Sequence, residues 1–136
     1  MNADFLDAND RHWQDAETLF VVGRFANADH LYGLSAECGL KRLMMAFGMN
    51  IDLYGKPADK NDLVHVDKIW VRYESYRSGR SAANYILPAS NQFGDWDVSQ
   101  RYAKQSEFNK AYVESHREGA DFVRNLIKKA KTEGLL

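Results

Sequence analysis

The sequence predicts an all-α protein: an up-and-down helical bundle of four main helices in one domain spanning residues 1–136. Three observations predict this class. Apolar residues recur at spacings of three and four along four segments. Only two prolines interrupt the chain, and no segment shows the alternating pattern of a half-buried strand. A length of 136 residues suits a single domain with a real hydrophobic core.

The first two predicted helices adjoin each other. Residues 5–23 place their apolar side chains on one helical face, and Asp4 stands near the start, where the helix dipole favours an acid. Gly23 forms a joint. Residues 25–47 then carry apolar or small side chains on nearly every side, which a helix tolerates only when neighbours surround it. This second segment is therefore predicted to be the central helix.

The rest of the chain predicts two more helices and two irregular stretches. Residues 48–62 are rich in turn-forming residues and predict a loop, of a length that is often functional. A third helix is predicted over 63–78 and ends where Gly79 interrupts it. A second irregular stretch precedes the last helix, residues 106–131, which has the clearest apolar stripe.

Composition excludes several classes of protein. A hydrophobic share of 45% and a charged share of 27% argue against disorder. Cys38 is the one cysteine, so an intrachain disulfide and a multi-cysteine zinc site are excluded, which fits a reducing compartment. The four histidines lack ligand-type spacing, and no phosphate-binding glycine motif occurs, so no metal and no cofactor are predicted. Without a leader or a long apolar run, the prediction is a soluble, cytoplasmic protein with no membrane contact.

Several polar residues form one line along the predicted central helix. His30 and Glu37 are seven residues apart and so share a face to within about 20°, with Lys41 one turn further. Asp29 lies beside this line, and Gly33 offers a place where another backbone or a ligand could approach closely. Buried charges must be paired. The line therefore predicts a packing role, in which Glu37 and Lys41 pair with each other or each joins a polar group on another helix. It is otherwise one wall of a pocket for a nucleotide or RNA phosphate, or a solvated edge of the bundle.

The middle of the chain is basic and aromatic. Residues 68–104 carry six bases and three acids, interleaved with seven aromatic residues, a mixture typical of proteins that hold single-stranded RNA. Trp70 and Tyr73 fall on the inner face of the predicted third helix and are assigned to the core. Region 93–102 is predicted to be more accessible because glycine and proline interrupt it nearby. Its candidate ligand-binding residues are Trp96, Arg101 and Tyr102.

The segment GRFANADHLYGLSAECGLKRLM, residues 23–44, resembles the HEPN superfamily of small helical domains. Further agreement comes from HWQDAETLFVVG at 12–23, HVDKIW at 65–70 and WDVSQRY at 96–102. The resemblance implies an up-and-down bundle that commonly forms a homodimer and is often encoded with a nucleotidyltransferase. For some members it also implies a metal-independent ribonuclease, in which an arginine precedes a histidine by a short spacing near the final helix.

This chain departs from that catalytic motif. Arg24 and His30 have the required spacing, but they lie at the entrance to the predicted central helix. Arg101 stands in the expected region, yet the next histidine, His116, is fifteen positions later. Catalysis of the usual kind is therefore not predicted.

The resemblance instead implies a nucleotide- or RNA-binding domain that acts with a partner nucleotidyltransferase, in a toxin–antitoxin or defence system. Arg101 and Lys41 would then hold phosphate, and Tyr102 or Trp96 would stack on a base. Two alternatives remain. One is a metal-independent ribonuclease, and the other is a structural dimerisation module whose interface the polar line seals.

Overall fold

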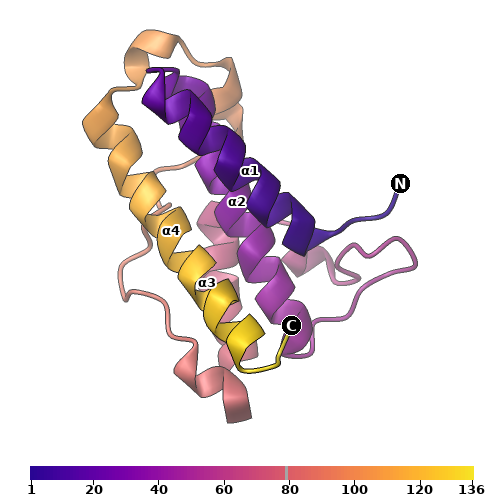
Figure 1. Ribbon diagram of the computed structural model, residues 1–136. Helices are drawn as coiled ribbons and strands as arrows, with labels where there is room; N and C mark the ends of the chain where they lie inside the picture. The colour runs from indigo at the N-terminus through magenta and orange to yellow at the C-terminus, as the bar shows by residue number, and fades with distance from the viewer. Residues whose placement is uncertain (79) are drawn as a thin grey trace.

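Four α-helices account for most of the structure, a computed structural model that describes residues 1–78 and 80–136 (Figure 1). The predicted interruption at Gly79 lies outside the described residues. The helices are α1 (Phe5–Val21), α2 (Phe25–Ala46), α3 (Val66–Arg77) and α4 (Lys110–Thr132). Four short 3-10 helices join them: η1 (Lys60–Asp62), η2 (Arg80–Asn84), η3 (Val98–Tyr102) and η4 (Gln105–Glu107). The described residues form no β-strand, and the predicted helical bundle is confirmed.

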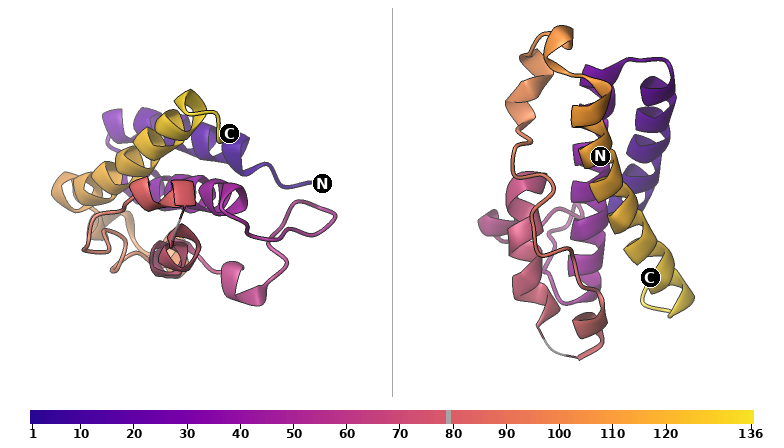
Figure 2. Two further views of the ribbon diagram at one scale, coloured as in Figure 1. Left: turned by 90° about the horizontal axis from the view of Figure 1, so that it is seen from below. Right: turned by 90° about the vertical axis from the view of Figure 1, so that its left-hand side faces the viewer.

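Helix α2 is the centre of the bundle, as its apolar surround predicts. Helices α1, α3 and α4 all pack against it (Figure 2). Leu40, Leu43 and Met44 are fully buried there. Gly39 shows how close the packing is, because a Cβ atom on this residue would overlap side chains of both α1 and α4. No helix in the described part of the chain is long and apolar enough to cross a membrane.

Caps decide where the helices begin and end. The Asp4 side chain accepts hydrogen bonds from two backbone amides and starts α1, as expected for an acid at this position. Gly23 adopts φ +79°, a left-handed conformation that turns the chain from α1 into α2. Helix α4 begins at Lys110 rather than 106, because the Asn109 side chain caps the Tyr112 amide. Residues 105–107 form η4 instead.

The chain between α3 and α4 returns along the bundle (Figure 2, right). We call residues 91–103 the strap. At one end the Asn91 side chain donates to the Asp67 carbonyl at 2.8 Å, and at the other end lies η3. The prediction that region 93–102 is accessible is wrong for two of its aromatic residues, since Phe93 and Trp96 are buried. Trp70 and Tyr73 lie in the core, as predicted.

Candidate functional site

Glu37 and Lys41 form an ion pair on α2 with an Nζ–Oε1 distance of 2.7 Å. The residues are 8% and 5% exposed. His65, just before α3, places its Nδ1 atom 3.1 Å from the other carboxylate oxygen of Glu37. The helical i,i+4 pair predicted from the sequence is therefore present, and it joins α2 to the start of α3. Its burial means that Lys41 is committed to Glu37.

His30 on α2 contacts the strap. Its ring stacks on Trp96, with 5.7 Å between centroids and 12° between planes. Burial, and next the positive charge of Arg101, lower the pKa of His30. Its Nδ1 atom is buried and has no hydrogen-bond partner within the described chain. His30 is therefore an imidazole whose surroundings favour the neutral form, with a buried Nδ1 atom that lacks a partner in the described chain.

His12 on α1 resembles His30 in its surroundings. Its Nδ1 atom is also buried without a partner among residues 1–78 and 80–136. Burial, followed by the charge of Arg11, lowers its pKa, and His30 and Glu37 both lie close enough to contribute. Sequence patterns assign no role to His12, because it lies on a different helix from the polar line. The structure thus brings a second neutral imidazole to the same side of α2.

Asp29 is a fully buried carboxylate at the junction of α2, α4 and the strap. Its Oδ1 atom lies 2.6 Å from Nδ1 of His116, and its Oδ2 atom accepts from Gln100 Nε2 at 2.5 Å. Its backbone carbonyl accepts from the Trp96 indole at 3.2 Å. Asp29 is one position from His30, about 100° around the helix, so it faces the strap and not Glu37.

His116 on α4 is held between two carboxylates. Its Nε2 atom lies 2.8 Å from Oδ1 of Asp95, opposite the Asp29 contact. Burial opposes charging of this ring, but the hydrogen bonds and charges of Asp29 and Asp95 outweigh burial and raise the pKa of His116. Because a carboxylate can only accept, both ring nitrogens must donate, and the ring is an imidazolium.

The strap packs its indole onto a glycine. Trp96 is 1% exposed, and its ring lies over Gly33 of α2, where a Cβ atom would overlap it. A group does approach Gly33 closely, but it is the Trp96 side chain and not the backbone or ligand that the sequence predicted. This tryptophan therefore cannot stack on a bound base, as the sequence had suggested, without leaving the core.

Arg101 and Tyr102 end η3 and are both exposed; the tyrosine is 79% exposed. The Arg101 guanidinium lies over the Tyr102 ring at 4.9 Å from the centroid. Asp97 and Gln100 form a capping box at the start of η3, which holds this turn in place. Arg101 takes part in none of the salt bridges found in the described chain. The pair is thus a preformed cation and aromatic surface.

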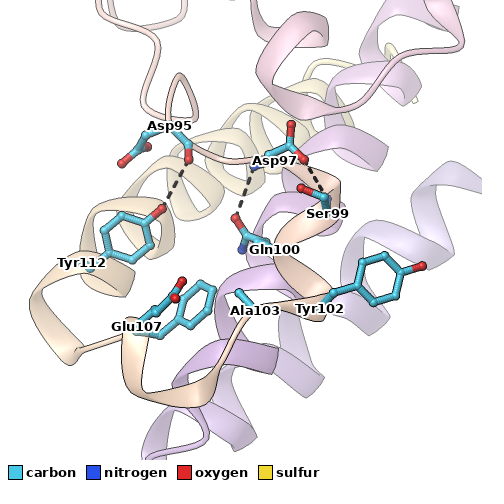
Figure 3. Close-up of a pocket in the computed structure, with 9 residues that line it drawn as sticks. Asp95, Asp97, Ser99, Gln100, Tyr102, Ala103, Glu107 and Tyr112 are labelled. Atoms are coloured by element: carbon cyan, nitrogen blue, oxygen red, sulfur yellow. Dashed lines mark hydrogen bonds between the residues drawn. The ribbon is translucent and has the colours of Figure 1, made fainter.

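A cavity of about 430 Å³ adjoins the strap and η3, and Tyr102 is among the residues that line it (Figure 3). Asp95, Asp97 and Glu107 line it, together with Tyr112, and no lysine or arginine does. The Tyr112 hydroxyl donates to the Asp95 carbonyl at 3.3 Å, across one wall of this cavity. Three carboxylates repel phosphate, so this cavity is not where a nucleotide would place its charge.

The arginine and histidine pairs considered from the sequence do not meet as the ribonuclease motif requires. Arg24 precedes the first residue of α2, and the six residues to His30 turn the helix by about 240°, so the two point in different directions. His116 faces Asp29 and Asp95, while Arg101 lies on Tyr102. The charge of Arg101 instead acts on His30, since it helps to lower the pKa of that ring, although no sequence spacing links the two residues. Within the described chain, no group of three or more His, Cys, Asp or Glu side chains could hold a metal ion.

Comparison with protein-family models, curated proteins and solved structures finds no match to this chain.

Proposed function

We propose that this chain is a HEPN-like nucleotide- or RNA-binding domain that holds phosphate at Arg101 and stacks a base on Tyr102. The observation that carries this proposal is the exposed Arg101–Tyr102 pair, with its guanidinium 4.9 Å from the ring centroid and no acidic partner among the described residues. A guanidinium can bind two phosphate oxygens at once, and an exposed ring can stack on any base.

His30 completes the proposed site. It lies close enough to Arg101 for the charge to lower its pKa. A neutral imidazole can donate to a phosphate oxygen or accept from a ribose hydroxyl. Its stack on Trp96 fixes the ring plane, so the site is organised before a ligand arrives.

The other candidate residues have structural contacts within the protein that hold the site in place. Lys41 is committed to Glu37 within the protein, and Asp29 and Trp96 hold the strap. We assign these four residues to the scaffold and not to the ligand. Because the Glu37–Lys41 pair is already satisfied inside one chain, it does not favour the alternative of a dimerisation module sealed by the polar line.

The resemblance to HEPN domains adds the biological setting to this proposal. On that basis the domain acts as a homodimer in the cytoplasm with a partner nucleotidyltransferase, in a toxin–antitoxin or defence system. The uneven charge of the chain is consistent with an RNA partner, because residues 68–104 have six bases and three acids.

A ribonuclease remains a second candidate, and one observation favours it. Metal-independent cleavage of RNA needs a base that is neutral near pH 7 and a cation for the charge that develops on phosphorus. His30 would supply the base, and Arg101, whose charge helps to lower the pKa of His30, would supply the cation.

Binding of fluorescently labelled single-stranded RNA and of labelled ATP, measured by anisotropy in EDTA, tests the proposal. We expect Arg101→Ala to weaken binding about tenfold or more, the usual effect of losing a phosphate contact and a stacked cation. The thermal midpoint should not change, because Arg101 is exposed. Lys104→Ala is the matched control, since it removes an exposed positive charge three residues away.

The result that would overturn the proposal is equal binding by the parent, Arg101→Ala and Lys104→Ala proteins, or no binding at all. The same RNA samples are then run on a denaturing gel. Shortened RNA that disappears with His30→Ala would identify the protein as a ribonuclease, and intact RNA with tight binding would identify a binding domain.

A further inference from the structure

We propose that His116 is a proton-operated latch for the strap, and thereby a positioning residue for ligand binding at Arg101 and Tyr102. The latch itself follows from the contacts of His116. Its effect on ligand binding rests on the proposed function.

The strap is fastened to the bundle at a small number of polar points near η3. Asp29 makes two of them, since its carboxylate accepts from Gln100 and its carbonyl accepts from Trp96. His116 makes the third by reaching the Asp95 side chain, and the Tyr112 hydroxyl makes a fourth by donating to the Asp95 carbonyl at 3.3 Å. His116, which lies on α4 and is 1% exposed, therefore contacts the carboxylates of both Asp29 and Asp95.

Each contact of His116 depends on its proton. As an imidazolium it donates from Nδ1 to Asp29 at 2.6 Å and from Nε2 to Asp95 at 2.8 Å. A neutral ring has one N–H only. The lone pair of its other nitrogen would then point at a lone pair of a carboxylate oxygen and be repelled. One of the two contacts must therefore open.

The contact that opens is the one to Asp95. Asp29 is fully buried and cannot leave its place, and an unpaired carboxylate there would be costly. The Asp95 side chain is 65% exposed and can turn into water. Loss of the proton from His116 therefore frees the Asp95 side chain, so that the strap is held at this residue only by the longer Tyr112 hydrogen bond, close to the turn that carries Arg101.

The charges that face His116 come from two elements only within the described chain. Asp29 on α2 and Asp95 on the strap both favour the imidazolium. Tyr112 packs edge-on from α4 with 5.1 Å between ring centroids, and burial together with these two carboxylates raises its pKa to about 12, so it stays neutral. Phe93 stacks on the opposite side at 5.2 Å and carries no charge.

The direction of the pH effect follows from the raised pKa of His116. The folded protein holds this proton more tightly than the unfolded chain does. The stability that the latch contributes is therefore complete below the ordinary histidine pKa, about 6.5, and is lost as pH rises through the higher folded value. The strap should be fastened at pH values below about 6.5 and should loosen as pH rises through the raised folded pKa of His116.

Nitrogen-15 NMR tests the latch without any ligand. We expect the His116 ring to titrate above pH 6.5, and the backbone amides of residues 95–103 and the Trp96 indole to shift along the same curve. Asp95→Asn should remove the shifts of the strap, because an asparagine amide can donate to neutral Nε2 and accept from protonated Nε2. Asp121→Asn, an exposed change of equal charge on α4, should leave the parent curve unchanged.

Anisotropy with the labelled RNA gives the functional readout. We expect binding by the parent to weaken about tenfold across the His116 titration, as one charge-assisted hydrogen bond is lost, and binding by Asp95→Asn to lose this pH step. A His116 ring that titrates below pH 6.5, or strap amides that do not follow it, would overturn the latch whether or not RNA binds. If the NMR curves coincide but RNA does not bind at any pH, the latch stands and the proposed function fails. If RNA binds with no pH step, the positioning role is overturned.

Discussion

Gly33→Ala tests how the strap is seated on the central helix. Gly33 lies within α2, and the Trp96 indole of the strap covers it. An added Cβ atom would lie 2.6 Å from Cζ2 of that ring and closer still to the two ring atoms beside it. The indole is 1% exposed and cannot turn aside into solvent.

Two opposing effects set the magnitude. Alanine in a helix interior is more favourable than glycine by about 0.5–1 kcal/mol. Against this, forcing one carbon into a closed contact costs about 1–3 kcal/mol. Moving the indole also breaks its hydrogen bond to the Asp29 carbonyl, which adds about 1 kcal/mol. We therefore expect Gly33→Ala to lower the free energy of unfolding by about 2 kcal/mol, or the thermal midpoint by roughly 8 °C.

Urea unfolding followed by circular dichroism measures the change. Gly94→Ala serves as the control, because its Cβ atom would meet only the Asn91 carbonyl at an ordinary 3.4 Å. A Trp96→Leu background should remove most of the loss caused by Gly33→Ala, since the large ring is then absent. If Gly33→Ala were as stable as the parent, or equally harmful with leucine at position 96, the close packing described here would be refuted.

Two further predictions concern the polar residues of α2. Lys41→Met should lower the free energy of unfolding, measured in urea, by about 3 kcal/mol, because it leaves Glu37 buried without its cation. Adding Glu37→Gln to Lys41→Met should restore much of the lost stability. If the losses of the two single variants simply add in the double variant, the pairing is contradicted. The second prediction concerns the free energy of unfolding between pH 6.5 and 5, where the contribution of His116 is constant. This free energy should decrease as pH decreases from 6.5 to 5. Burial lowers the pKa of His12 and His30 in the folded protein, so the unfolded chain binds protons at these residues first. Replacing both by glutamine should flatten this slope, and a slope that persists in that variant would assign it to other groups.

Periodicity along single helices predicted much of the fold. The four apolar stripes gave four helices, and the all-round apolar surface of α2 placed it at the centre. The Glu37–Lys41 pair was predictable because both residues lie on one helix, one turn apart. Only the helix ends differed by a few residues, where side-chain caps such as that of Asn109 outweighed the apolar pattern.

Contacts between distant segments were not predictable in this way. Asp29 and His116 are 87 residues apart, and Trp96 is 67 residues from its acceptor at Asp29. No spacing rule links such residues. One signal did exist: His116 is a polar residue on the apolar stripe of α4, and Asp29 is a carboxylate on an apolar helix. Two buried polar groups without local partners must find each other.

The burial of Trp96 explains why the neighbouring Arg101 and Tyr102 can be exposed and still fixed in place. The indole anchors the strap at Gly33, and the capping box of Asp97 and Gln100 then shapes the turn that follows. A turn held at its start presents its last two side chains in one orientation, so little conformational freedom remains to be lost when a ligand binds. Trp96 thus contributes to the binding surface from the core, by anchoring the turn that carries Arg101 and Tyr102.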